Sequence, residues 1–158
     1  MVPMRWGLVP TWYRAPNAGP LLINARAEGI ATKPAFRDAI RERRCLIPAD
    51  GFYEWQGEKG AKTPFIVQPR EGGLIAFAGL WQNWHGAPTC AIVTCPANAA
   101  LAPIHERMPV IIDPNDFGLW LGEEGPGAAR LMLPAAEDAF RAEPADAATR
   151  GALARRAG

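Results

Sequence analysis

The stretch LIAFAGLWQNWHGAPTCAIVTC, residues 74–95, decides the class of fold. Two apolar runs of strand length, 74–84 and 89–95, are separated only by HGAP, which has the composition of a turn. A connection this short cannot hold a crossover helix, so the two runs are predicted to pair antiparallel.

Similar short runs come earlier in the chain, at 45–49, 51–55 and 64–68, with only turn-like segments between them. Helical signals are few. Pro34 suits the first turn of a short helix, and a last helix is expected near 134–142. The order of these elements predicts a sandwich or barrel and not a parallel α/β sheet.

The chain of 158 residues is long enough for one domain with its own core. It is 49% hydrophobic and 21% charged, close to an average globular chain. No apolar run reaches about 18 residues and the N-terminus lacks the layout of a signal peptide, so a cytoplasmic protein is expected. Three cysteines are an odd number, which argues against a disulfide framework.

Charge is spread unevenly along the chain, although the net charge is only +1. Residues 1–56 hold eight basic and five acidic side chains, whereas residues 106–149 hold three basic and nine acidic ones. The N-terminal third is therefore locally basic. Most of the cations are arginines, whose guanidinium can contact a phosphate through two hydrogen bonds.

Glu54 lies among apolar side chains in the strand-like run GFYEW, 51–55. A buried carboxylate is costly unless it is paired. Two interpretations stay open. Glu54 is either a rim carboxylate paired with an arginine, or a group whose pKa is raised by apolar neighbours so that it acts as a general acid or base.

His105 lies in APIHERMPVI, between Pro103 and Pro109. It is either a packed or capping loop residue, or a proton shuttle or donor to a developing oxyanion. Arg107 follows two residues later and is a fixed cation suited to phosphate.

The segment LLINARAE, 21–28, alternates between apolar and polar side chains, so Asn24, Arg26 and Glu28 share one face of a predicted strand. A solvated outer face explains such alternation. Asn is depleted in strands, however, so Asn24 is also a modest hint of function.

No metal site is expected. The chain contains suitable ligand types, His85, Cys90, Cys95 and His105, but not the close pairs typical of zinc sites. Cys45 and Cys95 lie in apolar runs, which favours buried inert thiols over a Cys–His nucleophile. Trp12 lies in the basic region, where it either packs or stacks on a base of single-stranded nucleic acid.

Five blocks of the chain resemble one protein family in order and spacing: MRWGLVPTW, INARAE, KPAFRDAIRERRCLIPADGFYEW, AFAGLWQ and IHERMPVII. They are similar to the SRAP family, the SOS response-associated peptidases or abasic site processing proteins. The resemblance runs from about residue 4 to 121. Several long blocks in register are far more specific than one short motif.

The resemblance implies a single α+β domain on a curved, mostly antiparallel sheet or barrel, with a few short helices and a basic cleft. It implies a role in the DNA damage (SOS) response, with single-stranded DNA containing abasic sites as the partner. In the family, an N-terminal cysteine forms a Schiff base and then a thiazolidine with the opened sugar, which links protein to DNA. A peptidase activity, chiefly removal of the initiator residue, is also attributed to the family. No small-molecule cofactor and no membrane are implied.

Site residues carry over at matching positions. The resemblance implies that Asn24 orients the sugar or nucleophile, that Glu54 is a general acid or base, and that His105 assists the aldehyde chemistry. The DNA-binding residues that we expect are Arg26, Arg107, Arg5 and Arg37 as phosphate contacts and Trp12 as a stacking residue.

The chain departs from the family pattern at both ends. Family members begin Met-Cys-Gly-Arg, whereas residue 2 here is Val and no cysteine is N-terminal. We therefore expect residues 1–122 to form a truncated SRAP-like core that cannot close the thiazolidine. Residues 123–158 are expected to form a divergent C-terminal helix and a frayed tail. A truncated gene model explains two altered ends better than a specialised paralogue does.

Two rival functions stay open beside abasic-site processing. One is non-covalent binding of single-stranded DNA without catalysis. The other is an unrelated hydrolase that uses Glu54 and His105. A bacterial protein with either DNA-directed function is expected to associate with the nucleoid when bound to DNA.

Overall fold

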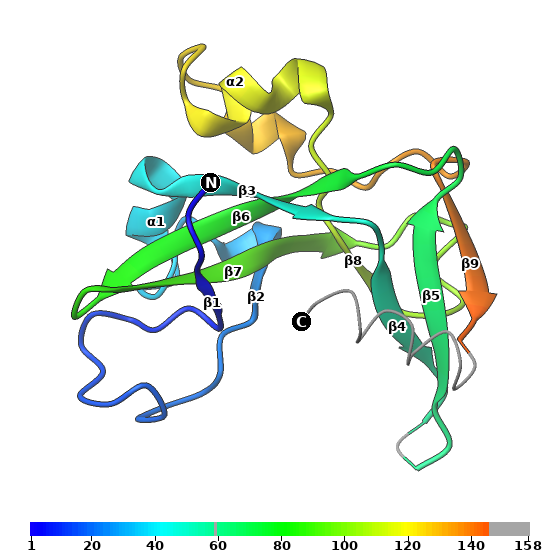
Figure 1. Cartoon of the computed structure of the whole chain (residues 1–158), viewed down its shortest axis with the longest axis horizontal. Helices are drawn as coiled ribbons and strands as arrows, with labels where there is room; N and C mark the ends of the chain where they lie inside the picture. Colours follow the sequence, from blue (N-terminus) through cyan, green and yellow to red (C-terminus); the bar gives the residue numbers. More distant parts are fainter. Residues whose placement is uncertain (59, 146–158) are drawn as a thin grey trace.

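The computed structural model describes residues 1–58 and 60–145, which form one α+β domain with two sheets (Figure 1). The strands are β1 (Arg5–Trp6), β2 (Asn24–Arg26), β3 (Arg44–Ala49), β4 (Phe52–Gln56), β5 (Thr63–Pro69), β6 (Ile75–Trp84), β7 (Ala87–Pro96), β8 (Arg107–Pro109) and β9 (Phe140–Pro144). The helices are η1 (Ala27–Gly29), α1 (Arg37–Glu42), η2 (Pro114–Asp116), α2 (Phe117–Leu121) and η3 (Ala128–Leu131). No helix within the described ranges is long and apolar enough to cross a membrane.

The predicted hairpin is confirmed and forms the centre of the larger sheet. β6 and β7 pair antiparallel around a turn at His85 and Gly86. Both turn residues have positive φ, 47° and 87°, as a two-residue hairpin loop requires. β3 adds antiparallel to β6, whereas β1 and β2 add parallel to β7. The sheet is therefore mixed. Parallel pairing of β2 with β7 is possible because the chain passes through α1 and four further strands between them.

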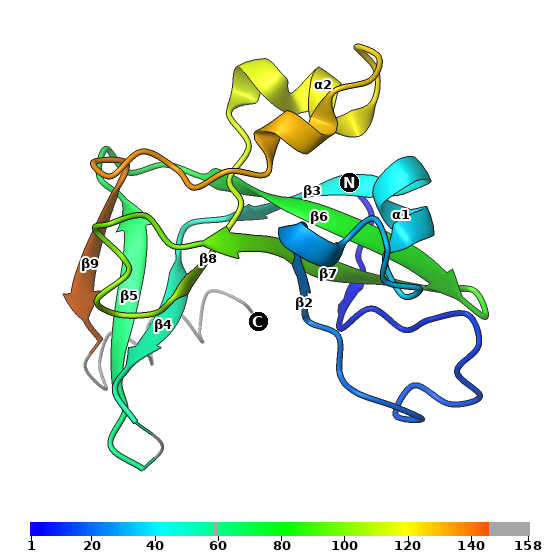
Figure 2. The ribbon, with the colours of Figure 1, turned by 180° about the vertical axis from the view of Figure 1, so that it is seen from behind.

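Residues 107–112 fill a gap between the far ends of β6 and β7. β8 pairs antiparallel with β7. The amide of Val110 donates to the carbonyl of Val93, and the amide of Ala78 donates to the carbonyl of Val110, both at 2.9 Å. The two central strands thus diverge, and the sheet curls as Figure 2 shows from behind.

A smaller sheet of order β4-β5-β9 stands beside the curled one. We predicted a helix near 134–142, and this prediction is wrong: β9 pairs antiparallel with β5 over 140–144. Phe140 of this strand is buried and packs edge-on against Phe52, with ring centroids 6.1 Å apart. An open strand edge and an apolar partner on it outweigh local helix propensity. The tail expected beyond this strand, 146–158, lies outside the described residues.

Trp120 joins helix α2 to the larger sheet and has no exposed surface. Its indole Nε1 donates to the carbonyl of Cys45 at 2.9 Å. The guanidinium of Arg44 donates to the carbonyl of Trp120 and lies 6.0 Å from the centre of the indole ring. Arg44 also donates to the carbonyl of Ile40 at 2.7 Å and so satisfies a carbonyl group in the last turn of helix α1.

Replacing Trp120 with alanine is expected to lower the free energy of unfolding by about 3–5 kcal/mol, because it opens a cavity and removes the indole hydrogen bond to the Cys45 carbonyl. Urea denaturation followed by circular dichroism measures this change. Trp12, with 57% of its surface exposed, supplies the matched control. Trp12→Ala should change the stability by no more than about 0.5 kcal/mol. Equal losses in the two variants would contradict this account of the core.

Candidate functional site

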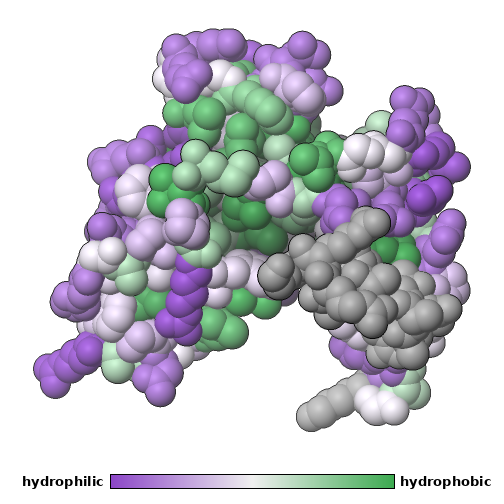
Figure 3. Space-filling model, in the orientation of Figure 1, coloured by the Kyte–Doolittle hydropathy of each residue, from purple (hydrophilic) through white to green (hydrophobic). Residues whose placement is uncertain are grey.

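A cavity of about 260 Å³ lies where β2, β4, β7 and the loop before β8 meet. Its lining residues are Asn24, Arg26, Glu54, Thr94, His105, Glu106, Arg107 and Met108. The structure thus brings together five of the predicted site residues from three separate parts of the chain. In the orientation of Figure 1, the space-filling view shows apolar side chains gathered over the central strands of the larger sheet and below helix α2 (Figure 3).

Strand β2 presents Asn24 and Arg26 to the cavity. Ala25 between them is fully buried, so the predicted alternation is confirmed over 24–26. The prediction that Glu28 continues this strand face is wrong, because the strand ends at Arg26 and Glu28 lies in η1. Parallel pairing places Asn24 beside Ile92 and Arg26 beside Thr94 of β7. Among the residues that the structure describes, Arg26 has no ion-pair partner, so its charge faces solvent at the cavity.

Glu54 on β4 is paired with His105 and not with an arginine. Its Oε2 lies 3.8 Å from Nδ1 of His105. Burial raises the pKa of Glu54 above its ordinary value of 4.5, while the charge of His105 and a hydrogen bond from the Trp55 amide act in the opposite direction. Glu54 therefore holds its proton at a higher pH than an exposed carboxyl group does.

The imidazole of His105 rests on the backbone of Arg107. Nδ1 lies 3.1 Å from the amide nitrogen and 3.0 Å from the carbonyl oxygen of Arg107. An unprotonated Nδ1 accepts from the amide, and a protonated one donates to the carbonyl. The ring therefore has one hydrogen bond to the backbone of Arg107 whether or not Nδ1 carries a proton.

Sequence reasoning missed Gln56 as a residue of this region. Its Nε2 donates to the carbonyl of Pro103 at 2.9 Å, which ties β4 to the loop that carries His105. The only available signal was that Gln56 shares a strand face with Glu54. A contact across 47 positions of sequence leaves no local pattern.

Arg107 is held by Glu28 of η1. The guanidinium donates two hydrogen bonds to the carboxylate, at 2.5 and 2.9 Å, and a third to the carbonyl of Thr94 at 2.8 Å. The hydrogen bonds from Arg107 are the main reason that the pKa of Glu28 falls to about 2. The cation expected to contact phosphate is therefore neutralised within the protein.

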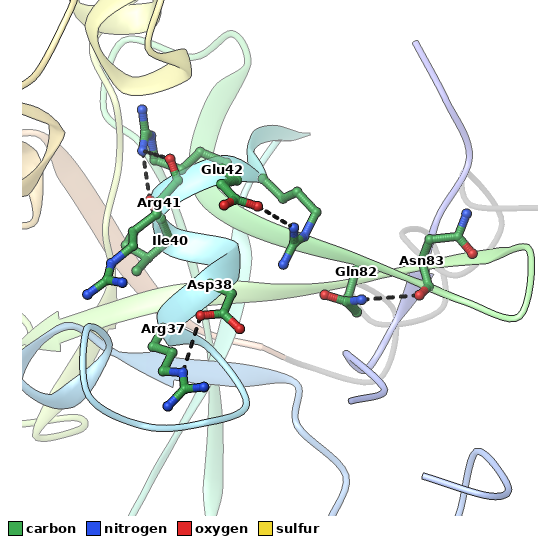
Figure 4. Close-up of polar contacts among 9 residues, drawn as sticks. Arg37, Asp38, Ile40, Arg41, Glu42, Gln82 and Asn83 are labelled. Atoms are coloured by element: carbon green, nitrogen blue, oxygen red, sulfur yellow. Dashed lines mark hydrogen bonds and ion pairs between the residues drawn. The ribbon is translucent and has the colours of Figure 1, made fainter. Parts of the chain in front are cut away.

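Three other predicted DNA contacts, Arg5, Arg37 and Trp12, do not line this cavity. Arg5 is exposed on β1, and Arg37 forms an ion pair with Asp38 on α1, 3.2 Å apart (Figure 4). Trp12 lines a second hollow of about 250 Å³ between its loop and helix α1.

The three thiols are poor nucleophiles where they lie. Burial raises the pKa of Cys45 to about 12 and that of Cys95 to about 11, and it also raises the pKa of Cys90. No group of three His, Cys, Asp or Glu side chains within 1–58 and 60–145 is placed to hold a metal ion.

Comparison with known proteins decides the family. The sequence model of the family described as "SOS response associated peptidase (SRAP)" matches residues 1–149. The chain belongs to this family. The resemblance carried by the five sequence blocks is thus confirmed.

Two curated relatives come from Bacillus subtilis (strain 168). The chain is 42% identical over 124 residues to the abasic site processing protein YoqW, covering 75% of this chain and 55% of that protein. It is 41% identical over 140 residues to the abasic site processing protein YoaM, covering 83% and 62%. The chain therefore spans somewhat more than half the length of these relatives.

A solved structure supports the same fold. An X-ray crystal structure of a protein from Bacteroides thetaiotaomicron has a TM-score of 0.82 and 29% sequence identity, covering 91% of this chain and 68% of that one. The predicted α+β fold on a curved sheet is confirmed.

Replacing Glu54 with glutamine should make stability less dependent on pH. Because the folded state raises the pKa of Glu54, the unfolded chain loses this proton first as pH rises above about 4.5, and folding becomes less favourable. Glutamine removes this penalty, so the variant should gain stability relative to the parent as pH rises through that window. Urea unfolding at several pH values from 4 upward measures the difference in the free energy of unfolding between the variant and the parent.

Gln82→Ala is the control for this experiment, because Gln82 carries no ionisable group and does not line the cavity. Its stability difference should have the same size at every pH. A gap between Glu54→Gln and the parent that does not change with pH would contradict the raised pKa of Glu54.

Proposed function

We propose that this chain is the lesion-binding part of an abasic-site processing protein of the DNA damage (SOS) response. Its substrate is single-stranded DNA with an abasic site. One observation carries the proposal: Asn24, Glu54 and His105 come from three separate parts of the chain and line one cavity with Arg26. The names of the relatives, abasic site processing proteins, point to the same lesion.

The chemistry of the lesion fits these side chains. An abasic sugar in its open form presents an aldehyde. When an amine or a thiol adds to the carbonyl carbon, the carbonyl oxygen takes up a proton. Glu54 retains a proton at higher pH than an ordinary carboxyl group and donates it to that oxygen. His105, 3.8 Å away, accepts or returns the proton. Asn24 offers an amide donor and acceptor to the sugar.

Phosphate binding falls mainly to Arg26 in this proposal, because it faces the cavity without an ion-pair partner among the described residues. Arg107 lies at the same cavity, but its guanidinium is engaged by Glu28. Arg5, Arg37 and the exposed indole of Trp12 are proposed to contact the strand farther from the lesion. None of the buried thiols is assigned the role of nucleophile. The site of action is the bacterial cytoplasm, at the nucleoid.

Fluorescence anisotropy with a labelled single-stranded oligonucleotide tests the substrate. Binding should be tighter when the oligonucleotide contains one abasic site, and it should weaken as salt rises. Arg26→Ala should lower affinity and reduce the salt slope by roughly 0.7, the value for one lost phosphate contact on a single strand. Arg141→Ala, which removes an exposed arginine of β9, is the control and should leave both unchanged. Equal affinity for abasic and intact DNA would overturn the proposal.

A denaturing gel of the chain incubated with abasic DNA separates chemistry from binding. A covalent product or cleaved strand that decreases in Glu54→Gln would support the acid–base role of Glu54. A preference for abasic DNA without any product would instead favour the non-covalent binder.

A further inference from the structure

Glu28 lies outside the cavity but is connected to it through Arg107. Glu28 belongs to η1, directly after β2, and Arg107 begins β8. Thr94 of β7 pairs with Arg26 on one side and with Pro109 on the other, so β2 and β8 flank opposite edges of β7. The ion pair between Glu28 and Arg107 therefore crosses over β7 and joins the two flanking strands.

Thr94 of β7 contacts Arg107 where the ion pair crosses this strand. The Nη2 atom of Arg107 donates to the carbonyl of Thr94 at 2.8 Å and lies 3.4 Å from its hydroxyl. The Arg107 side chain is only 15% exposed. A cation this enclosed depends on a compensating charge, and Glu28 supplies it.

We call the ion pair between Glu28 and Arg107 the clamp. At one end it reaches the imidazole of His105, because both backbone groups of Arg107 lie within hydrogen-bond distance of Nδ1. A displacement of Arg107 therefore displaces the ring. At its other end, the clamp continues into β2, which carries Asn24 and Arg26. The ion pair thus adds a side-chain contact between two halves of the proposed site that β7 already joins by its pairing with β2 and β8.

We propose that Glu28 is a positioning residue of this site: its ion pair with Arg107 fixes His105 against the strand that carries Asn24 and Arg26. The catalytic meaning of this inference rests on the proposed function, but its geometry can be tested without DNA. The low pKa of Glu28, about 2, keeps the clamp ionised over the range in which Glu54 gains and loses its proton. The clamp therefore does not loosen while the acid–base pair works.

Nuclear magnetic resonance of the imidazole nitrogens tests the geometry. The chain has two histidines, and His85 in the β6–β7 turn serves as an internal reference. Glu28→Gln keeps the size of the side chain and removes its charge. We expect the nitrogen signals of the His105 ring to shift and broaden in this variant, while those of His85 stay unchanged.

A charge-retaining variant supplies the second arm. Glu28→Arg should disturb His105 more than Glu28→Gln does, whereas Glu28→Asp keeps the carboxylate and should leave the His105 signals closer to those of the parent chain. This order separates a lost ion pair from a general failure to fold, which circular dichroism of each variant reports. Unchanged His105 signals in Glu28→Gln, or equal changes in folded Glu28→Asp and Glu28→Gln, would overturn the inference.

The DNA arm distinguishes this role from a phosphate contact by Arg107. We expect Glu28→Gln to reduce the preference for abasic over intact DNA by roughly tenfold, the upper range for the loss of one hydrogen-bonded contact. If Arg107 instead bound phosphate, Glu28→Gln would release its charge and raise affinity for both oligonucleotides, which would overturn the inference. Should the parent chain show no preference for abasic DNA, the proposed function fails, and the histidine signals still decide the clamp.

Discussion

The position of the site depends on one constraint, the insertion of residues 107–112 between β6 and β7. If the central hairpin stayed paired to its ends, the edges of both strands would be occupied there. Instead, Val93 accepts from the Val110 amide and the Ala78 amide donates to Val110, so the inserted segment satisfies both separated strands. The same insertion starts β8 at the edge of β7 opposite β2. His105 and Arg107 thereby come to lie near Asn24 and Arg26.

The curl that follows from this insertion also sets the electrostatics of the cavity. It places β4 beside the loop of His105, where Glu54 is partly removed from water and faces an imidazole. Removal from water raises the pKa of Glu54 and, by the same physics, the pKa of the three thiols. The effect suits the acid–base role proposed for Glu54 and is unfavourable for a thiolate. The carboxyl group and the thiols lie in separate places, but loss of water favours the protonated form at each of them.

The sequence predicted well what depends on local pattern. The hairpin of 74–95, the helix after Pro34 and the alternation at 24–26 each leave a periodic or turn signal, and each is present in the fold. Contacts between distant segments leave no such signal. The parallel pairing of β1 and β2 with β7, the ion pair between positions 79 apart and the strand at 140–144 were all outside its reach. Strand β9 was missed because its segment is rich in Ala and Glu and so has helical propensity, whereas its strand conformation depends on pairing with the open edge of β5.

The basic character of the N-terminal third has a different meaning in the structure. Counting charges suggested a footprint for nucleic acid, but two of the arginines around α1 are engaged within the protein. Arg43 pairs with Glu42, and Arg44 donates to the carbonyl groups of Ile40 and Trp120. Arg37 and Arg41 stay exposed, and Arg37 pairs only with its neighbour Asp38 (Figure 4).

Each cation that is engaged within the protein reduces the affinity for DNA that phosphate alone can supply, since that contribution grows with the number of phosphates neutralised. Under the proposed function, discrimination between damaged and intact strands comes from the cavity, because the phosphates of both strands are the same. In that proposal Arg26 supplies charge at the rim, and Glu54 and His105 contact a sugar that has lost its base. A site with a weak general attraction and a specific cavity selects its lesion by geometry more than by charge.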